Sequence, residues 1–195
     1  VTPEDQVVAA RLALARAVVA LEESRWEDAR TLALRAASVF RAERLREDEA
    51  SAHEVMALIA LASRNLSDAQ SEIAQAEKLL VGQDFLCRMS VGITAARVLA
   101  ATKRPQDLAA AHRTLLDLRN RASGLQYVLL EYEVRLALHE VELALAPARP
   151  GPLGPAEFEA EARKMGQALL ARKVAAAVAG KPSVSGIRPL GLMVR

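Results

Sequence analysis

Apolar residues recur every three or four positions over most of residues 4–146, and no stretch alternates convincingly with a period of two. This spacing puts apolar side chains on one face of an α-helix, which turns once every 3.6 residues. It predicts an all-α chain of about eight helices, arranged as consecutive antiparallel pairs. The first helix is expected to open near Glu4, with Thr2 as N-cap, Pro3 in the first turn and Asp5 as the capping acid.

The ends of the next helices are predicted from capping residues and from breaks in the pattern. Ser24 and Glu27 have the spacing of a capping box, in which two side chains satisfy backbone donors where a helix begins. Ser67 and Gln70 repeat this spacing. The other breaks are expected near Arg46, Gly82, Pro105 and Gly124.

The C-terminal quarter changes character. Residues 147–155 hold four prolines and two glycines in nine positions, which predicts a linker because proline lacks a backbone donor. Residues 156–179 resume a helical pattern and predict a final helix, and 180–195 predict an extended or disordered tail. The helical region 1–146 is expected to divide at about 4–46, 47–82, 83–123 and 124–146, the last being the first helix of a final pair.

The chain repeats itself. A shift of 40 residues aligns Ala17–Leu21 with Ala57–Leu61, and a further 39 reaches Ala96–Ala100. The turns follow, with Asp28, Asp68 and Asp107 in matching places. Self-similarity at a fixed period is typical of a solenoid, because each unit shelters its apolar face against the next copy.

Small residues recur in this repeat at Ala17, Ala29, Ala36, Ala57, Ala69, Ala76 and Ala96. With these positions and the bulky turn residues Trp26 and Leu66, the chain resembles the tetratricopeptide repeat (TPR) family, whose paired helices keep small residues at their crossing. Alanine replaces the family's glycine, Leu108 and Leu115 replace two small residues of the third repeat, and the period exceeds the usual ~34. The chain is most similar to the degenerate alanine- and arginine-rich arrays attached to large bacterial signalling and regulatory proteins.

The resemblance implies a right-handed superhelical array, a TPR-like α-solenoid, with a concave groove lined by the first helix of each pair. It implies a non-catalytic scaffold that binds a peptide or helix of a partner protein in that groove. The implied groove residues are Arg11, Leu14, Val18, Glu22, Ser51, Glu54, Leu58, Ser90, Ile93 and Arg97. The alternative is a sensory or regulatory helical domain of a larger bacterial signalling enzyme or transcription regulator, holding a small ligand between hairpins.

The composition favours helices. The charge balance gives no strong positive electrostatic field that would attract the phosphates of a nucleic acid. Hydrophobic residues make up 52% of the 195 positions but aromatic residues only 3%, because Ala, Leu and Val dominate. The 26 Lys and Arg against 24 Asp and Glu leave a formal charge of +2. The arginines between Arg25 and Arg46 interleave with acidic residues, which predicts a salt-bridged, solvated face rather than a phosphate-binding stripe.

No residue pattern points to catalysis. His53, His112 and His139 fall in different predicted helices, and none has a second histidine at metal-binding spacing. The lone Cys87 lies among apolar residues, which predicts a buried small side chain rather than a nucleophile. The sequence therefore predicts no enzyme, no metal site and no cofactor.

The sequence also bears on membrane insertion, cellular compartment and association of the chain. No apolar run is long enough to cross a bilayer and no signal peptide is recognisable, so membrane insertion is not expected. The single cysteine is compatible with a reducing, cytoplasmic compartment. Because the chain does not begin with methionine, we expect a fragment of a longer protein. A homodimer through the terminal helix is also expected, because Ala168, Leu169, Ala176 and Val178 would make a poor polar cap.

Overall fold

The computed structural model describes residues 2–80, 84–122, 127–145, 155–164, 166 and 168–178. These residues form helices and turns and contain no strand, so the all-α prediction is confirmed. The chain divides into two compact units, with a border after Val98. The predicted linker up to residue 154 and the predicted tail 180–195 lie outside the described residues.

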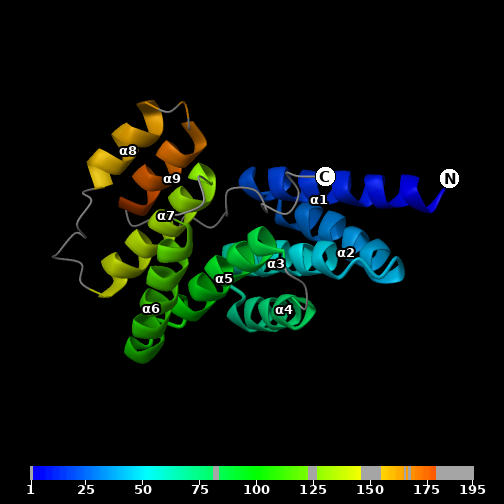
Figure 1. Ribbon diagram of the computed structural model, residues 1–195, viewed down its shortest axis with the longest axis horizontal. Coiled ribbons are helices and arrows are strands. Elements are labelled where there is room, and N and C mark those ends of the chain that lie inside the picture. The colour runs from blue at the N-terminus through cyan, green and yellow to red at the C-terminus, as the bar shows by residue number, and fades with distance from the viewer. Residues whose placement is uncertain are drawn as a thin grey trace. The chain divides into compact units, whose positions relative to one another are not determined.

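The first unit contains α1 (Pro3–Glu22), α2 (Trp26–Ala42), α3 (Arg46–Ala62), α4 (Leu66–Leu79) and most of α5 (Phe85–Ala100). From α1 to α4 each helix packs against the next one along the chain (Figure 1), and α1 also touches α3. The predicted start of α1 is confirmed: Thr2 is the N-cap, and Thr2 and Asp5 form both hydrogen bonds of a capping box.

One backbone turn closes three successive helices. Ser24, Arg44 and Arg64 have φ values of 60°, 58° and 58°, in the left-handed region, and lie twenty residues apart. In each turn the next amide donates across the helix end at 2.8 Å: Arg25 to Ala20, Leu45 to Phe40 and Asn65 to Ala60. The same helix-plus-turn unit therefore occurs three times in succession, from α1 to α3, whereas α4 ends at Leu80 in another conformation, with φ -74°.

Both predicted capping boxes after α1 are wrong. Ser24 belongs to the left-handed turn that ends α1, and α2 starts after Arg25 without a side-chain cap. At α4 the cap is Asn65, whose side chain accepts from the Asp68 amide at 3.2 Å, while Ser67 lies inside the helix. Ser24 does not cap α2 because it takes the left-handed conformation that ends α1, and at α4 the N-cap position is held by Asn65, one residue before the helix.

The small repeat positions are buried throughout the described chain. All seven are at most 2% exposed: Ala17, Ala29, Ala36, Ala57, Ala69, Ala76 and Ala96. The first three join Leu14 and Phe40 in a core shared by α1, α2 and α3. Such burial is what a close helix crossing requires, because an interaxial distance near ~8 Å leaves room for little more than a methyl group.

The second unit contains α6 (Pro105–Ala122), α7 (Val128–Leu145), α8 (Pro155–Lys164) and α9 (Ala168–Val178). Here α6 packs on α7, α8 packs on α9, and α7 touches α9. Where one final helix over 156–179 was expected, the structure has two, separated at Gly166 with φ +72°. The break was missed because the apolar pattern is helical on both sides and the turn between them is very short.

Candidate functional site

A buried polar seam joins α3 to α5 in the first unit. Glu54 on α3 is 2% exposed, and its Oε1 accepts hydrogen bonds from Ser90 Oγ at 2.7 Å and Thr94 Oγ1 at 2.9 Å. Ser90 and Thr94 are four residues apart, so both hydroxyls lie on the same face of α5. The second oxygen, Oε2, is also buried and has no hydrogen-bond partner among the described residues.

The seam leaves Glu54 poised between its two protonation states. Burial raises the pKa of Glu54 to about 7, against the lowering effects of the Ser90 and Thr94 hydrogen bonds and of the nearby Arg97 charge. Removal from water disfavours the ionised form, and only one carboxylate oxygen is compensated by donors. Glu54 therefore keeps its proton to a higher pH than an exposed carboxyl group does.

Cys87 continues the seam along α5. It is buried, and its sulfur lies 3.7 Å from Ser51 Oγ and 3.6 Å from the Glu47 carbonyl oxygen. Burial raises the pKa of the thiol to about 12, so Cys87 stays protonated. The prediction that Cys87 is buried is confirmed.

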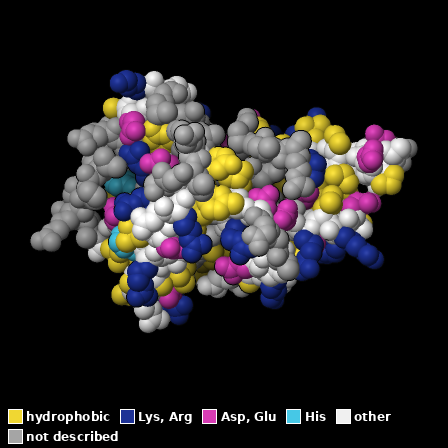
Figure 2. All heavy atoms as spheres, viewed as in Figure 1, with side chains coloured by type: hydrophobic (Ala, Val, Ile, Leu, Met, Phe, Trp, Pro, Cys, Tyr) yellow, Lys and Arg dark blue, Asp and Glu magenta, His cyan; other side chains and the backbone are white. Residues whose placement is uncertain are grey.

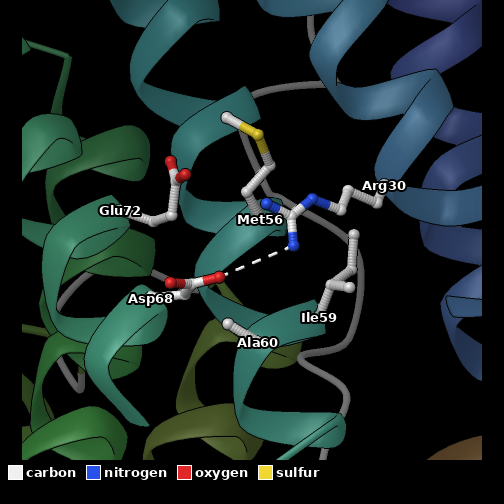
Figure 3. Close-up of a pocket in the computed structure, with 6 residues that line it drawn as sticks. All are labelled: Arg30, Met56, Ile59, Ala60, Asp68 and Glu72. Carbon is white, nitrogen blue, oxygen red and sulfur yellow. Dashed lines mark ion pairs between the residues drawn. The ribbon is translucent and has the colours of Figure 1, made fainter. Parts of the chain in front are cut away.

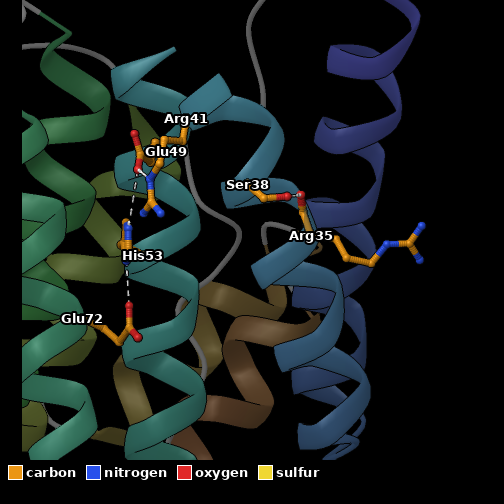
Figure 4. A network of polar contacts seen from close by, with 6 residues as sticks. All are labelled: Arg35, Ser38, Arg41, Glu49, His53 and Glu72. Carbon is orange, nitrogen blue, oxygen red and sulfur yellow. Dashed lines mark hydrogen bonds and ion pairs between the residues drawn. The ribbon is translucent and has the colours of Figure 1, made fainter. Parts of the chain in front are cut away.

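An ionic network links α2, α3 and α4 nearby (Figure 4). Arg41 Nε lies 2.7 Å from Glu49 Oε1, and His53 lies 3.9 Å from Glu49 and 2.7 Å from Glu72. Its residues come from three consecutive helices, so the network ties their packing together. His53 on α3 therefore links this helix to α4 through Glu72.

The other two histidines lie in the second unit. His112 Nε2 is 3.4 Å from Glu142 Oε1, which links α6 to α7, and His139 is buried. In the same unit Glu161 on α8 accepts from Tyr132 at 3.0 Å and pairs with Arg135 at 2.9 Å, both on α7. The hydrogen bond from Arg135 lowers the pKa of Glu161, so this carboxylate is ionised and holds α8 to α7.

A small pocket opens between α2, α3 and α4 (Figure 3). Arg30, Met56, Ile59, Ala60, Asp68 and Glu72 line it. Arg30 reaches across to Asp68 at 3.5 Å, and the interior has room for about one water molecule. An organic ligand does not fit in this space, and the pocket is best described as the surroundings of an ion pair.

The predicted charge balance of the surface is visible in the ion pairs. Arg25 lies 2.7 Å from both Glu23 and Asp28, and basic and acidic side chains are interspersed on the face drawn in Figure 2. Arg30 and Arg41 of α2 are also paired, with Asp68 and Glu49, as expected for a salt-bridged face.

No family model, no curated protein and no solved structure matches this chain. The likeness to TPR arrays therefore rests on the residues that carry it, and remains a prediction. In the parts of the chain that the structure describes, no three His, Cys, Asp or Glu side chains are grouped to hold a metal ion. Among the same residues, no helix has both the length and the apolarity needed to cross a membrane.

The residues predicted for the groove are mostly buried. The buried ones are Leu14, Val18, Ser51, Glu54, Leu58, Ser90, Ile93 and Arg97. Arg11 and Glu22 are partly exposed, and Arg11 makes two hydrogen bonds to Asp48, at 3.0 and 2.9 Å. The structure thus brings Glu54 and Ser90 into direct contact, in a seam between neighbouring repeats. The groove itself stays a prediction, and a partner could reach the buried members only after they are uncovered.

Thr94, Cys87 and Asp48 belong to these contacts but were not singled out as groove residues. A signal for them does exist in the sequence. The contacts between repeats join residues 36 to 40 positions apart, as in Glu54 with Ser90 and Thr94. A search for complementary polar residues separated by about one repeat length would have found them.

Proposed function

We propose that the chain is a non-catalytic helical-repeat scaffold, a TPR-like right-handed array that binds a peptide or helix of a partner protein. One observation carries the proposal: the same left-handed turn recurs at Ser24, Arg44 and Arg64. A constant turn gives each helix a similar relation to the one before it. Repetition of one such step is the construction principle of solenoids, which use the resulting extended surface for binding.

Packing within the first unit supports the same architecture. Each helix from α1 to α4 contacts its successor, and the alanines at the crossings are buried. The groove residues that remain accessible, Arg11 and Glu22, carry opposite charges, which suits an amphipathic partner of mixed charge better than a polyanion. Access to Glu54 and its neighbours would require a partner that displaces what covers them.

Selection of peptides by display on the full chain, followed by hydrogen–deuterium exchange of each complex, tests this function. We expect selected peptides to protect amides of α1, α3 and α5, the first helices of the predicted pairs. Protection confined to α2 and α4 would contradict the groove. Failure to select any peptide above background would contradict the scaffold function itself.

The seam favours a second candidate, the sensory or regulatory domain. A buried carboxylate with one uncompensated oxygen can accept a donor from a small ligand, as Glu54 Oε2 would. A small molecule that raises the melting temperature of the chain, with the rise lost in Glu54→Gln, would support this candidate. No rise across a panel of small amines and amides would leave the scaffold as the only function proposed.

A further inference from the structure

The contact between α3 and α5 combines the polar seam with an apolar core. Glu54 of α3 is buried in the seam and accepts from Ser90 and Thr94 of α5. One turn before Ser90, the buried Cys87 lies against Ser51 of α3. Buried apolar side chains of both helices belong to one core cluster, namely Ala50, Ala57, Val91 and Val98. Glu54 is therefore part of the packing that holds α5 on α3.

This packing is not balanced for a charged carboxylate. Both hydroxyl donors reach the same oxygen of Glu54, Oε1, while Oε2 is buried without a hydrogen-bond partner among the described residues. A buried charge that lacks donors costs more free energy than a buried neutral carboxyl group. Burial accordingly raises the pKa of Glu54 to about 7. Once Glu54 is ionised, any movement that brings water to Oε2 is favoured.

The charges around Glu54 do not remove this imbalance. From α5, the charge of Arg97 favours the ionised form, yet the pKa of Glu54 stays raised. The Cys87 thiol is protonated near neutral pH, because burial raises its pKa to about 12. The charged groups that the other helices bring to α3 are paired with residues other than Glu54: Arg11 of α1 with Asp48, Arg41 of α2 with Glu49, and Glu72 of α4 with His53.

We propose that the seam between α3 and α5 is a pH-sensitive joint, in which a protonated Glu54 holds α5 closed on α3 and an ionised Glu54 lets α5 move away. The moving element is α5, since it lies at the border of the first unit, after Val98, whereas α3 packs on both α2 and α4. The joint follows from the seam alone. Its use in binding rests on the proposed function, because opening uncovers the predicted groove residues Ser51 and Ser90 as the pH rises.

Labelling of Cys87 with N-ethylmaleimide reports the opening, because Cys87 is the only cysteine of the chain and lies in the seam. The rate is measured between pH 5 and 8 and divided by the rate for Glu54→Gln at the same pH, which cancels every pH effect that the two chains share. Opening releases one proton, so we expect the ratio to rise by up to about ten-fold per pH unit and to level off above about pH 7.

Glu43→Gln is the matched control for this labelling. It makes the same change at an exposed position, and its rate should follow that of the parent chain at every pH. A ratio of parent to Glu54→Gln that stays constant from pH 5 to 8 would overturn the proposal.

Hydrogen–deuterium exchange of the unmodified chain distinguishes an opening of α5 from unfolding of the whole chain, and needs no variant at Glu54. After correction for the intrinsic rate at each pH, amides of α5 should exchange about ten-fold or more faster at pH 8 than at pH 5. At pH 8 they should also exchange faster than amides of α1 and α2, and respond less to low concentrations of urea, because a local opening exposes less surface. An unchanged corrected rate for α5 would overturn the proposal. So would equal rates and equal urea dependence in α1, α2 and α5, because the fold would then open only as a whole.

Discussion

Replacing Glu54 by glutamine should remove a defined part of the pH dependence of stability. The pKa of this carboxyl is about 7 in the folded chain, against 4.5 for the ordinary group. Because the folded state holds the proton more tightly, Glu54 favours folding most below pH 4.5. Its contribution is lost as the pH rises from 4.5 to about 7.

The size of the effect follows from the same two values. Moving a pKa from 4.5 to about 7 is equivalent to about 3 kcal/mol, at 1.36 kcal/mol per tenfold change in the ionisation constant. The steepest loss corresponds to one proton, about 1.4 kcal/mol per pH unit. Glutamine keeps an oxygen that can accept from Ser90 and Thr94 but does not titrate, so the variant lacks this loss.

Urea unfolding followed by circular dichroism between pH 4 and 8 measures the effect as a difference between Glu54→Gln and the parent chain. We expect the difference in free energy of unfolding to move in favour of the variant by about 3 kcal/mol over this range. Glu43→Gln makes the same change at an exposed position and serves as the control. A flat difference curve for Glu54→Gln would refute the link between burial and protonation.

Further predictions concern the turns, the crossings and the seam. Ser24→Gly should raise the free energy of unfolding by up to about 1 kcal/mol, because glycine adopts the left-handed turn without strain; a lower value in urea unfolding would contradict this. Ala36→Leu should cost about 1–3 kcal/mol by overpacking the α1–α2 crossing, while Ala42→Leu on the exposed side should change stability little; equal effects would contradict the crossing. Thr94→Val removes one donor to Glu54 and should raise the pKa of Glu54, measured by carbon NMR titration; an unchanged pKa would mean that this hydrogen bond does not bear on the ionised form.

The helices could be predicted because they depend on local periodicity, whereas the turns between them could not. The start of α1 at Thr2 carries the usual capping residues, and the structure uses them. The left-handed turns are occupied by Ser24, Arg44 and Arg64, where the common signal is glycine. Without that signal, a capping box at Ser24 was the more natural interpretation, and it was wrong.

The candidate site was harder to predict because burial depends on which helices cover one another. The sequence of α3 contains Glu49, Ser51, His53 and Glu54, residue types that usually lie at the surface, yet all four are buried. Helical phase alone could place Glu54 on a face of α3, but not show that Ser90 and Thr94 would meet it from α5. Only the repeat separation links the three residues in the sequence.

We propose that the helix pairs of the first unit progress in one direction, as in a solenoid. Spin labels at Gln6, Arg46 and Arg88 occupy the first turns of α1, α3 and α5, about one repeat apart and exposed, while buried Cys87 stays unlabelled. Pairwise distances from double electron–electron resonance measure this progression. We expect similar distances for 6 to 46 and 46 to 88, and a distance from 6 to 88 roughly twice as long. A distance from 6 to 88 no longer than a single step would mean that these helices fold back into a closed bundle.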